Sequence, residues 1–284
     1  MLAGSESPLA SAPQLCEPAR MAQNEPDSEL SQEVQENIRA HLAHLLGYVV
    51  NLVRGKRGRP LTEPAGLASG FVVKKDDRYF LLSAGHAVNK HQWYWEMNVD
   101  LSDQRCCLCL PVGPFTLLKR FSLSEDGSSV TAKRKIDVGW CELDIKKLTK
   151  QFTADPRLTG KTLEIPAYHG PLDERPVANA ELYSFAAWNR GLLIPVGVLL
   201  LERSPSFEVG MRFVRENKHG KYVFKLGRSH QGHAYYKGAS GAPIATPDGK
   251  IISMVLGGSS KRNEIYGLPL ADYGSLLALC TNTI

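Results

Sequence analysis

The sequence predicts a mainly β protein, and three observations support this. Short runs rich in β-branched and aromatic residues recur along the chain, separated by Gly, Pro and charged turns. Helical periodicity is nearly absent from about residue 48 to about residue 270. With 284 residues, 43% of them apolar, the chain has room for one large β domain or two subdomains of about 100 residues each. The strand spacing is typical of antiparallel sandwiches or barrels.

The N-terminal part of the chain has a different composition. Residues 1–27 are rich in Ser, Pro, Ala and Glu, which bury too little apolar surface to offset the entropy of ordering, so we predict a flexible leader. In residues 28–47, apolar side chains recur at helical spacing: Leu30, Val34, Ile38, Leu42 and Leu45. Asp27 or Ser28 can cap the start of this helix and Gly47 can end it. We expect an amphipathic helix that packs on the fold rather than a membrane anchor.

Strands are predicted over the rest of the chain. The candidates are residues 48–53, 70–73, 79–82, 138–143, 181–187, 192–201, 222–226, 243–245 and 251–256. A helix-compatible pattern returns in residues 270–280. Residues 156–171 are expected to cross between two halves, which we place at 48–155 and 156–284.

Composition and charge narrow the functional classes. The net charge of +5 is mild, and the basic residues are mixed with 29 acidic ones, so the charge does not require nucleic acid as a partner. No apolar run of about 18 residues is present, and the first twenty residues lack a secretory pattern. Six cysteines have no regular disulfide spacing. We therefore expect a cytoplasmic protein with reduced thiols and no membrane segment.

A candidate nucleophile lies late in the chain, in Gly238-Ala239-Ser240-Gly241-Ala242. A serine between two glycines on a tight turn can present its hydroxyl to a substrate. Backbone N–H groups of the same turn can point at a developing oxyanion. Ser240 is therefore the first candidate catalytic residue.

A serine hydroxyl needs a base, and a histidine suits that task near neutral pH. His86 follows the predicted strand 79–82 and three small residues, which would let its side chain project into a cleft. A carboxylate entering a buried strand commonly orients such an imidazole. Asp137 fits this description; Asp126 and Asp144 are also available, but the Val-Gly-Trp that follows favours Asp137.

These three segments resemble the trypsin- and chymotrypsin-like serine proteases, and more closely the bacterial branch that includes the Deg-type proteases. The matching patterns are Ser-Ala-Gly-His at 83–86, Asp-Val-Gly at 137–139 and Gly-Ala-Ser-Gly-Ala-Pro at 238–243. They occur in the family's order, and His, Asp and Ser are separated by 51 and 103 residues. Segments 68–73, 248–252 and 266–270 also resemble family strands, so the likeness covers roughly residues 48–280.

The resemblance implies a chymotrypsin-like fold of two antiparallel six-stranded β-barrels with an N-terminal and a C-terminal helix. It implies a serine endopeptidase that cleaves protein or peptide substrates through an acyl-enzyme and needs no cofactor. Ser240 would be the nucleophile, His86 the base, and Asp137 the residue that orients His86. The N–H groups of Gly238 and Ser240 would form the oxyanion hole.

Several positions depart from the family pattern. Ala239 replaces the aspartate that binds a new N-terminus in animal digestive relatives, which argues against that activation route. Ala242 replaces a usual glycine, and its Cβ could restrict the turn. Ala234, at the expected base of the substrate pocket, carries no carboxylate, so a small or medium apolar side chain is expected there rather than Lys or Arg. The strand expected to pair with substrate consists of Leu256, Gly257 and Gly258.

Two other functional classes remain open. The first is a catalytically silent protease-fold module that recognises a regulatory protein partner through its cleft or its N-terminal helix. The second is DNA binding through the basic loop at 54–60, which contains Arg57, although a solvated loop is the favoured interpretation. No metal site is expected, because neither the cysteines nor the histidines have a zinc-site spacing. The cysteines in question are Cys106, Cys107 and Cys109, and the histidines are His230 and His233.

Overall fold

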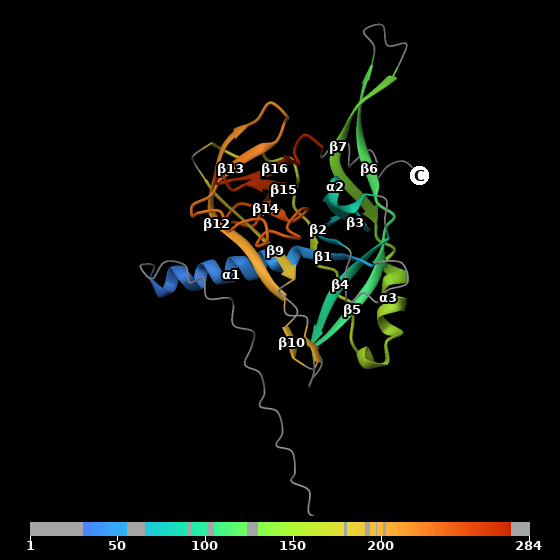
Figure 1. The fold of residues 1–284 in the computed structure, drawn as a ribbon. Helices are drawn as coiled ribbons and strands as arrows, with labels where there is room; N and C mark the ends of the chain where they lie inside the picture. Colours follow the sequence, from blue (N-terminus) through green and yellow to red (C-terminus); the bar gives the residue numbers. More distant parts are fainter. Residues whose placement is uncertain are drawn as a thin grey trace, which may run out of the picture.

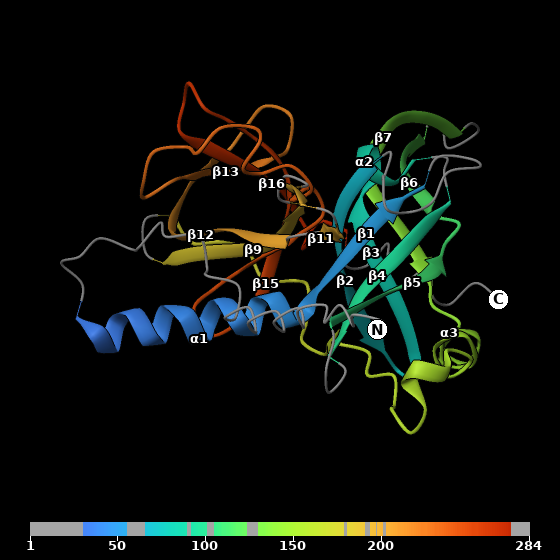
Figure 2. The same ribbon diagram turned by 60° about the horizontal axis from the view of Figure 1, so that its bottom comes forward.

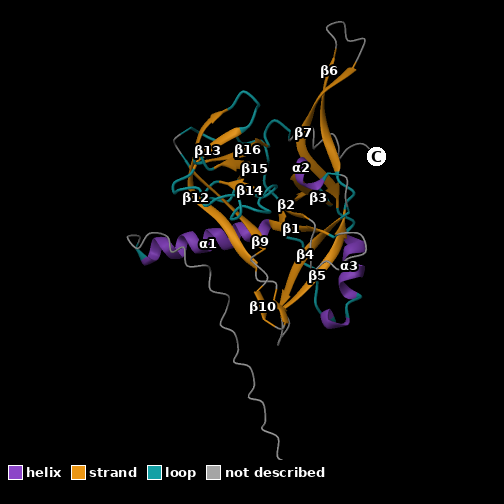
Figure 3. Ribbon diagram, in the orientation of Figure 1, coloured by secondary structure: helices purple, strands orange, loops and turns teal. Residues whose placement is uncertain are grey.

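The protein is a two-part, mainly β structure, as the sequence predicts (Figures 1 and 3). The computed structural model describes residues 31–55, 66–89, 92–100, 105–123, 130–178, 181–190, 194–196, 198–200 and 203–273. The predicted leader, the C-terminal helix beyond residue 273 and most of the basic loop lie outside these residues.

The first part is a curled, half-barrel sheet with strand order β5-β4-β1-β2-β3-β7-β6. Its strands are β1 (Val49–Arg54), β2 (Gly66–Lys75), β3 (Arg78–Ala84), β4 (Trp93–Asp100), β5 (Arg105–Val112), β6 (Thr116–Leu123) and β7 (Val130–Glu142). A short eighth strand, β8 (Ala167–Tyr168), pairs in parallel with β2. β8 comes from the segment assigned to the second half, so the division at residue 155 stays a prediction. Buried apolar side chains, Trp93 and Leu81 among them, fill the space inside this sheet.

The second part is a closed antiparallel barrel of six strands, in the order β12-β13-β16-β15-β14-β9. The strands are β9 (Leu182–Arg190), β12 (Arg203–Glu216), β13 (Tyr222–Lys225), β14 (Pro243–Ala245), β15 (Ile251–Ser259) and β16 (Glu264–Pro269). A small hairpin, β10 (Ile194–Val196) and β11 (Val198–Leu200), lies between β9 and β12 in the chain. Buried aromatic rings form much of the barrel core: Tyr183, Phe185, Tyr222 and Phe224. Figure 2 shows this barrel beside the first sheet.

The predicted N-terminal helix is present as α1 (Gln32–Tyr48), with Ser31 as its N-cap. It therefore begins after the expected caps, continues through Gly47 and ends as the chain enters β1. Leu42 and Leu45 are buried in a cluster shared with the second barrel, and the His41 ring contacts the Ser184 hydroxyl on β9. The helix thus packs against the barrel (Figure 2). No described helix is long and apolar enough to cross a membrane.

One helix was not expected from the sequence. α3 (Ile145–Thr153) follows β7, and the Asp144 side chain caps it by accepting a hydrogen bond from the Lys147 N–H at 3.0 Å. Leu148 and Phe152, four residues apart, are buried in the first core. The helix has no clear signal in the sequence, because nine residues contain too few helical turns for an apolar period to stand out among the lysines. The short α2 (Gly85–Val88) and a single 3-10 turn, Pro156–Leu158, complete the helical segments described.

Candidate active site

His86 and Asp137 are brought together by two neighbouring strands. β3 leads directly into α2, which carries His86, and β3 pairs with β7 so that Ala84 lies opposite Val138. Gly85 allows this close approach: a Cβ there would lie 3.0 Å from the Val138 nitrogen and 3.2 Å from the Asp137 carbonyl carbon. The small residue before the histidine is therefore required by packing against β7.

The His86 ring and the Asp137 carboxylate form a close pair. Nδ1 of His86 lies 2.9 Å from Oδ2 and 3.0 Å from Oδ1, and the His86 backbone N–H donates to Oδ1 at 2.7 Å. Burial opposes ionisation of Asp137, but the hydrogen bonds and charge of His86 outweigh it, so the pKa of this carboxyl lies below its usual value. An ionised Asp137 accepts a hydrogen bond from the Nδ1–H of His86, and this tautomer leaves Nε2 as an acceptor.

Ser240 completes the group from the other half of the molecule. Its Oγ lies 3.2 Å from Nε2 of His86, within hydrogen-bonding distance. Ser240 is half-buried, whereas 48% of the His86 side chain is exposed. The structure therefore brings together all three residues singled out from the sequence, two from the first sheet and one from the second barrel.

The turn that carries Ser240 is held by both halves. The Gly241 N–H donates to the Val255 carbonyl oxygen at 2.8 Å within the barrel, and the Ser69 N–H of β2 donates to the Ser240 carbonyl oxygen at 2.9 Å. Gly241 has φ +97°, and a Cβ there would lie 2.0 Å from the Ser69 oxygen. Only glycine fits, both for its φ and for its space. Ala242 is fully buried and is not among the described non-glycine residues with positive φ, so its methyl group fits this turn without backbone strain.

The backbone N–H groups around Ser240 fall into two pairs, one hydrogen-bonded within the protein and one not. The Ala239 N–H donates to the Tyr236 carbonyl oxygen at 3.0 Å, and the Ala242 N–H donates to the Ala239 carbonyl oxygen at 2.9 Å. Within the described part of the chain, the N–H groups of Gly238 and Ser240 donate to no protein acceptor. They are the two groups expected to form an oxyanion hole.

The residues predicted to contact substrate lie on either side of this turn. β15 has a bulge at Leu256, after which Gly257 and Gly258 pair with β16 on one edge. No described strand pairs with the other edge of these two glycines, since β14 ends its pairing at Met254. Ala234 is exposed in the turn that precedes Ser240. An extended peptide would therefore find an open strand edge next to Ser240.

Sequence reasoning missed two serines that support the nucleophile turn. Ser69 Oγ donates to the Gly238 carbonyl oxygen at 2.7 Å, and Ser83 Oγ donates to the Ser69 carbonyl oxygen at 2.6 Å. Both are fully buried. A serine inside an otherwise apolar strand was the available signal, because a buried hydroxyl needs a partner.

The described residues contain no group of three or more His, Cys, Asp or Glu side chains that could hold a metal ion. Among the described cysteines, Cys109 and Cys141 form no disulfide. Burial raises the pKa of Cys141 to about 12, so this thiol stays protonated and unreactive.

Comparisons with known proteins place the fold in a class. No model of a known protein family matches the sequence, and no curated protein matches it. The structure resembles that of GrC, with a TM-score of 0.51 and 12% identity over 84% of this chain and 96% of that chain. It also resembles HBP, with a TM-score of 0.50 and 11% identity over 85% of this chain and 94% of that chain. A third similar structure is neuropsin, a serine protease expressed in mouse brain, at a TM-score of 0.48 and 11% identity over 82% and 94%.

The fold is thus chymotrypsin-like, with one closed six-stranded barrel beside a curled half-barrel sheet where the sequence predicts a second six-stranded barrel. Identity of 11–12% supports the fold alone. The assignment to the bacterial Deg-type branch is narrower than this and stays a prediction.

Proposed function

We propose that this protein is a serine endopeptidase in which Ser240, His86 and Asp137 form the catalytic triad. The observation that carries the proposal is the continuous series of contacts from the Asp137 carboxylate through the His86 ring to the Ser240 hydroxyl. Nucleophile, base and orienting group stand in hydrogen-bonding distance and in the required order.

The reaction follows from this geometry. Ser240 Oγ attacks the scissile carbonyl carbon while its proton passes to Nε2 of His86, and Asp137 stabilises the imidazolium that forms. The N–H groups of Gly238 and Ser240 hydrogen-bond the developing oxyanion. The imidazolium then gives its proton to the leaving amine, and the acyl-enzyme remains. Water, deprotonated by His86, hydrolyses the ester and restores Ser240.

Protein or peptide substrates are proposed to bind in extended form along Leu256, Gly257 and Gly258. The open edge of β15 beside Ser240 supports this, because backbone pairing would hold the scissile bond near the hydroxyl. A small or medium apolar side chain next to Ala234 stays part of the proposal. So do a cytoplasmic location and a regulatory partner at α1.

A fluorophosphonate probe tests the nucleophile. The wild type should be labelled, Ser240→Ala should not, and Ser229→Ala, an exposed serine of the same barrel, should label like the wild type. A peptide library cut by the wild type and left intact by Ser240→Ala would support the activity. Labelling that persists in Ser240→Ala overturns the assignment, and an unlabelled, inactive wild type would favour the binding-module alternative.

A further inference from the structure

Glu208, in the middle of β12, is a buried carboxyl that the proposed reaction does not use. Its side chain is 0% exposed. A carboxyl so placed is costly unless it is paired and hydrogen-bonded. Its partners therefore indicate what it stabilises.

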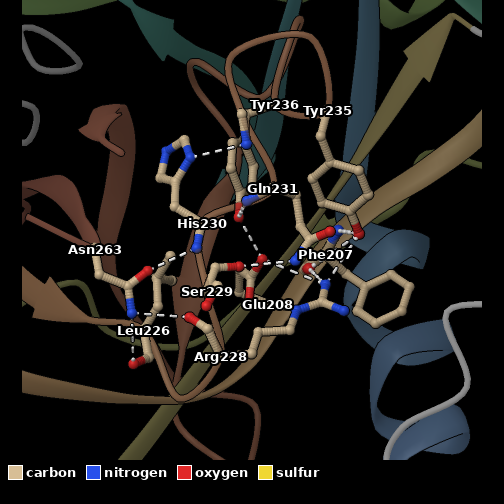
Figure 4. Close-up of polar contacts among 11 residues, drawn as sticks. Phe207, Glu208, Leu226, Arg228, Ser229, His230, Gln231, Tyr235, Tyr236 and Asn263 are labelled. Carbon is tan, nitrogen blue, oxygen red and sulfur yellow. Dashed lines mark hydrogen bonds and ion pairs between the residues drawn. The ribbon is translucent and has the colours of Figure 1, made fainter. Parts of the chain in front are cut away.

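Those partners come from the segment that leads to Ser240. Tyr236 donates its hydroxyl to Oε1 of Glu208 at 2.5 Å. Arg228 donates from Nε to Oε2 at 3.1 Å and from Nη2 to Oε1 at 3.3 Å. Figure 4 shows Arg228 and both tyrosines of the turn directed toward Glu208 and its neighbour Phe207.

The second tyrosine fastens the same turn to the adjacent residue of β12. Tyr235 Oη accepts from the Phe207 N–H at 3.2 Å and lies 3.3 Å from the Phe207 carbonyl oxygen. The Arg228 guanidinium lies 5.4 Å from the Phe207 ring centre and 5.7 Å from that of Tyr235. Consecutive tyrosines thus attach to consecutive residues of one strand.

The Tyr236 backbone connects this attachment to the candidate oxyanion hole. Its carbonyl oxygen accepts the Ala239 N–H at 3.0 Å, which closes a four-residue turn whose central peptide carries the Gly238 N–H. Ala239 itself is apolar and only 1% exposed, so position 239 supplies no charge that could anchor the turn. Glu208 thus holds the Tyr236 hydroxyl, and the Tyr236 carbonyl oxygen fixes the turn that precedes Ser240.

The other side of Tyr236 is also held. The His230 ring packs on the Tyr236 ring with centroids 4.5 Å apart. His230 Nδ1 accepts a hydrogen bond from the Gly232 N–H at 3.0 Å. Its Nε2 lies next to Gly258 of β15, since a Cβ added at Gly258 would be 3.2 Å from it. Tyr236 is therefore fixed between β12 and the strand edge proposed to bind substrate.

We propose that Glu208 and Tyr236 are positioning residues, which hold the turn so that the Gly238 and Ser240 N–H groups face one oxyanion. This inference rests on the proposed function and deepens it. The buried carboxyl of Glu208 anchors the turn through Tyr236, whereas the methyl side chain of Ala239 has no polar group that could do so. Burial raises the pKa of the Glu208 carboxyl, against the hydrogen bonds from Arg228 and Tyr236. Burial and the contact with Glu208 also raise the pKa of Tyr236, so its hydroxyl remains a donor in any ordinary assay.

Tyr236→Phe removes one hydroxyl and tests the proposal with little change of shape. We expect the rate constant for fluorophosphonate labelling, and kcat for a peptide substrate, to fall about tenfold to a hundredfold with little change in KM, because a displaced oxyanion donor acts on the transition state. Tyr183→Phe is the matched control: Tyr183 is buried in the same barrel and donates to Glu181 at 3.0 Å. Its labelling rate should stay within about twofold of the wild type.

Two further readouts separate positioning from general stability. Hydrogen–deuterium exchange over residues 229–242 should be faster in Tyr236→Phe than in Tyr183→Phe. Glu208→Gln combined with Tyr236→Phe should label no more slowly than the slower single variant, because both act through one contact. Equal labelling and equal exchange in the two tyrosine variants would overturn the inference. An unlabelled wild type would instead contradict the proposed function, and the exchange comparison would still decide whether Glu208 and Tyr236 order the turn.

Discussion

The Ser69 N–H donates a hydrogen bond to the Ser240 carbonyl oxygen at 2.9 Å, which joins the first sheet to the candidate nucleophile. The contact lies where β2 meets the turn before β14, and buried Ser83 supports it from β3. The position of Ser240 relative to His86 therefore depends on backbone contacts between the halves as well as on the contact between their side chains.

Gly241→Ala should disrupt this junction. The added methyl group would lie 2.0 Å from the Ser69 carbonyl oxygen and 2.6 Å from Ser83 Oγ, at a residue with φ +97°. We expect a loss of at least about 2 kcal/mol in the free energy of unfolding, measured by urea titration. Gly160→Ala is the control, because Gly160 also has positive φ but no atom within 4 Å of the added carbon. Equal losses in both variants would show that the junction is not tightly packed.

Asp137→Asn should lower kcat strongly while leaving the fold intact. The amide can no longer hold the Nδ1 proton of His86 as a carboxylate does, so the tautomer needed at Nε2 is disfavoured. In the trypsin triad the corresponding change lowers kcat about 10⁴-fold, and we expect a loss of that order here. Steady-state kinetics with a peptide substrate checks it; a loss below about tenfold would contradict the role given to Asp137.

The same variant predicts a pH dependence of stability. The pKa of Asp137 is lowered from an ordinary value of 3.8, so its ionised form stabilises the fold. That contribution is fully present above the ordinary value and is lost as pH falls through the lower folded-state pKa. Thermal unfolding of the wild type and Asp137→Asn should therefore differ most above about pH 4 and converge at the acid end. A difference in unfolding temperature between the two proteins that stays constant down to about pH 2 would contradict a stabilising role for ionised Asp137.

Ala239→Asp should destabilise the protein. Position 239 is 1% exposed within an apolar cluster, so a carboxylate there would lack water. We expect a cost of about 3 kcal/mol or more near neutral pH, smaller in acid where the side chain is protonated. Ala234→Asp, exposed on the same turn, should change stability by less than about 0.5 kcal/mol. A stable, more active Ala239→Asp would mean that the turn accepts a charged anchor after all.

Ala242→Gly tests the residue that departs from the family at the turn. Because Ala242 does not need positive φ and its methyl group is fully buried, glycine should cost about 1 kcal/mol and leave the fluorophosphonate labelling rate within about twofold. Chemical denaturation and probe kinetics measure the two effects. A tenfold faster reaction in the glycine variant would show that the alanine restrains the oxyanion hole.

The sequence predicts the site better than the strands around it. His86, Asp137 and Ser240 each lie beside a short apolar strand in a local pattern that resembles a serine-protease motif, and the structure places the three side chains within hydrogen-bonding distance. β12 was not predicted, because its charged residues interrupt the apolar run and a register shift between Glu208 and Met211 breaks the two-residue period.

Contacts between distant segments could not be read from local patterns. The hydroxyl of Tyr236 meets Glu208 across 28 residues only because the barrel closes. Ser69 likewise meets Gly238 across 169 residues when the two halves pack. Pairings of this kind depend on tertiary structure, whereas the helix α1 was predictable because its apolar period is local.

His86 and Asp137 come from one part of the fold and Ser240 from the other, which has a consequence during synthesis. Translation delivers His86 and Asp137 first, and Ser240 follows Asp137 by 103 residues. The barrel that holds Ser240 closes through β16, which ends at Pro269. A chain still growing on the ribosome therefore cannot close the barrel that holds Ser240, and cannot bring its hydroxyl to His86 as in this structure, until β16 has been synthesised.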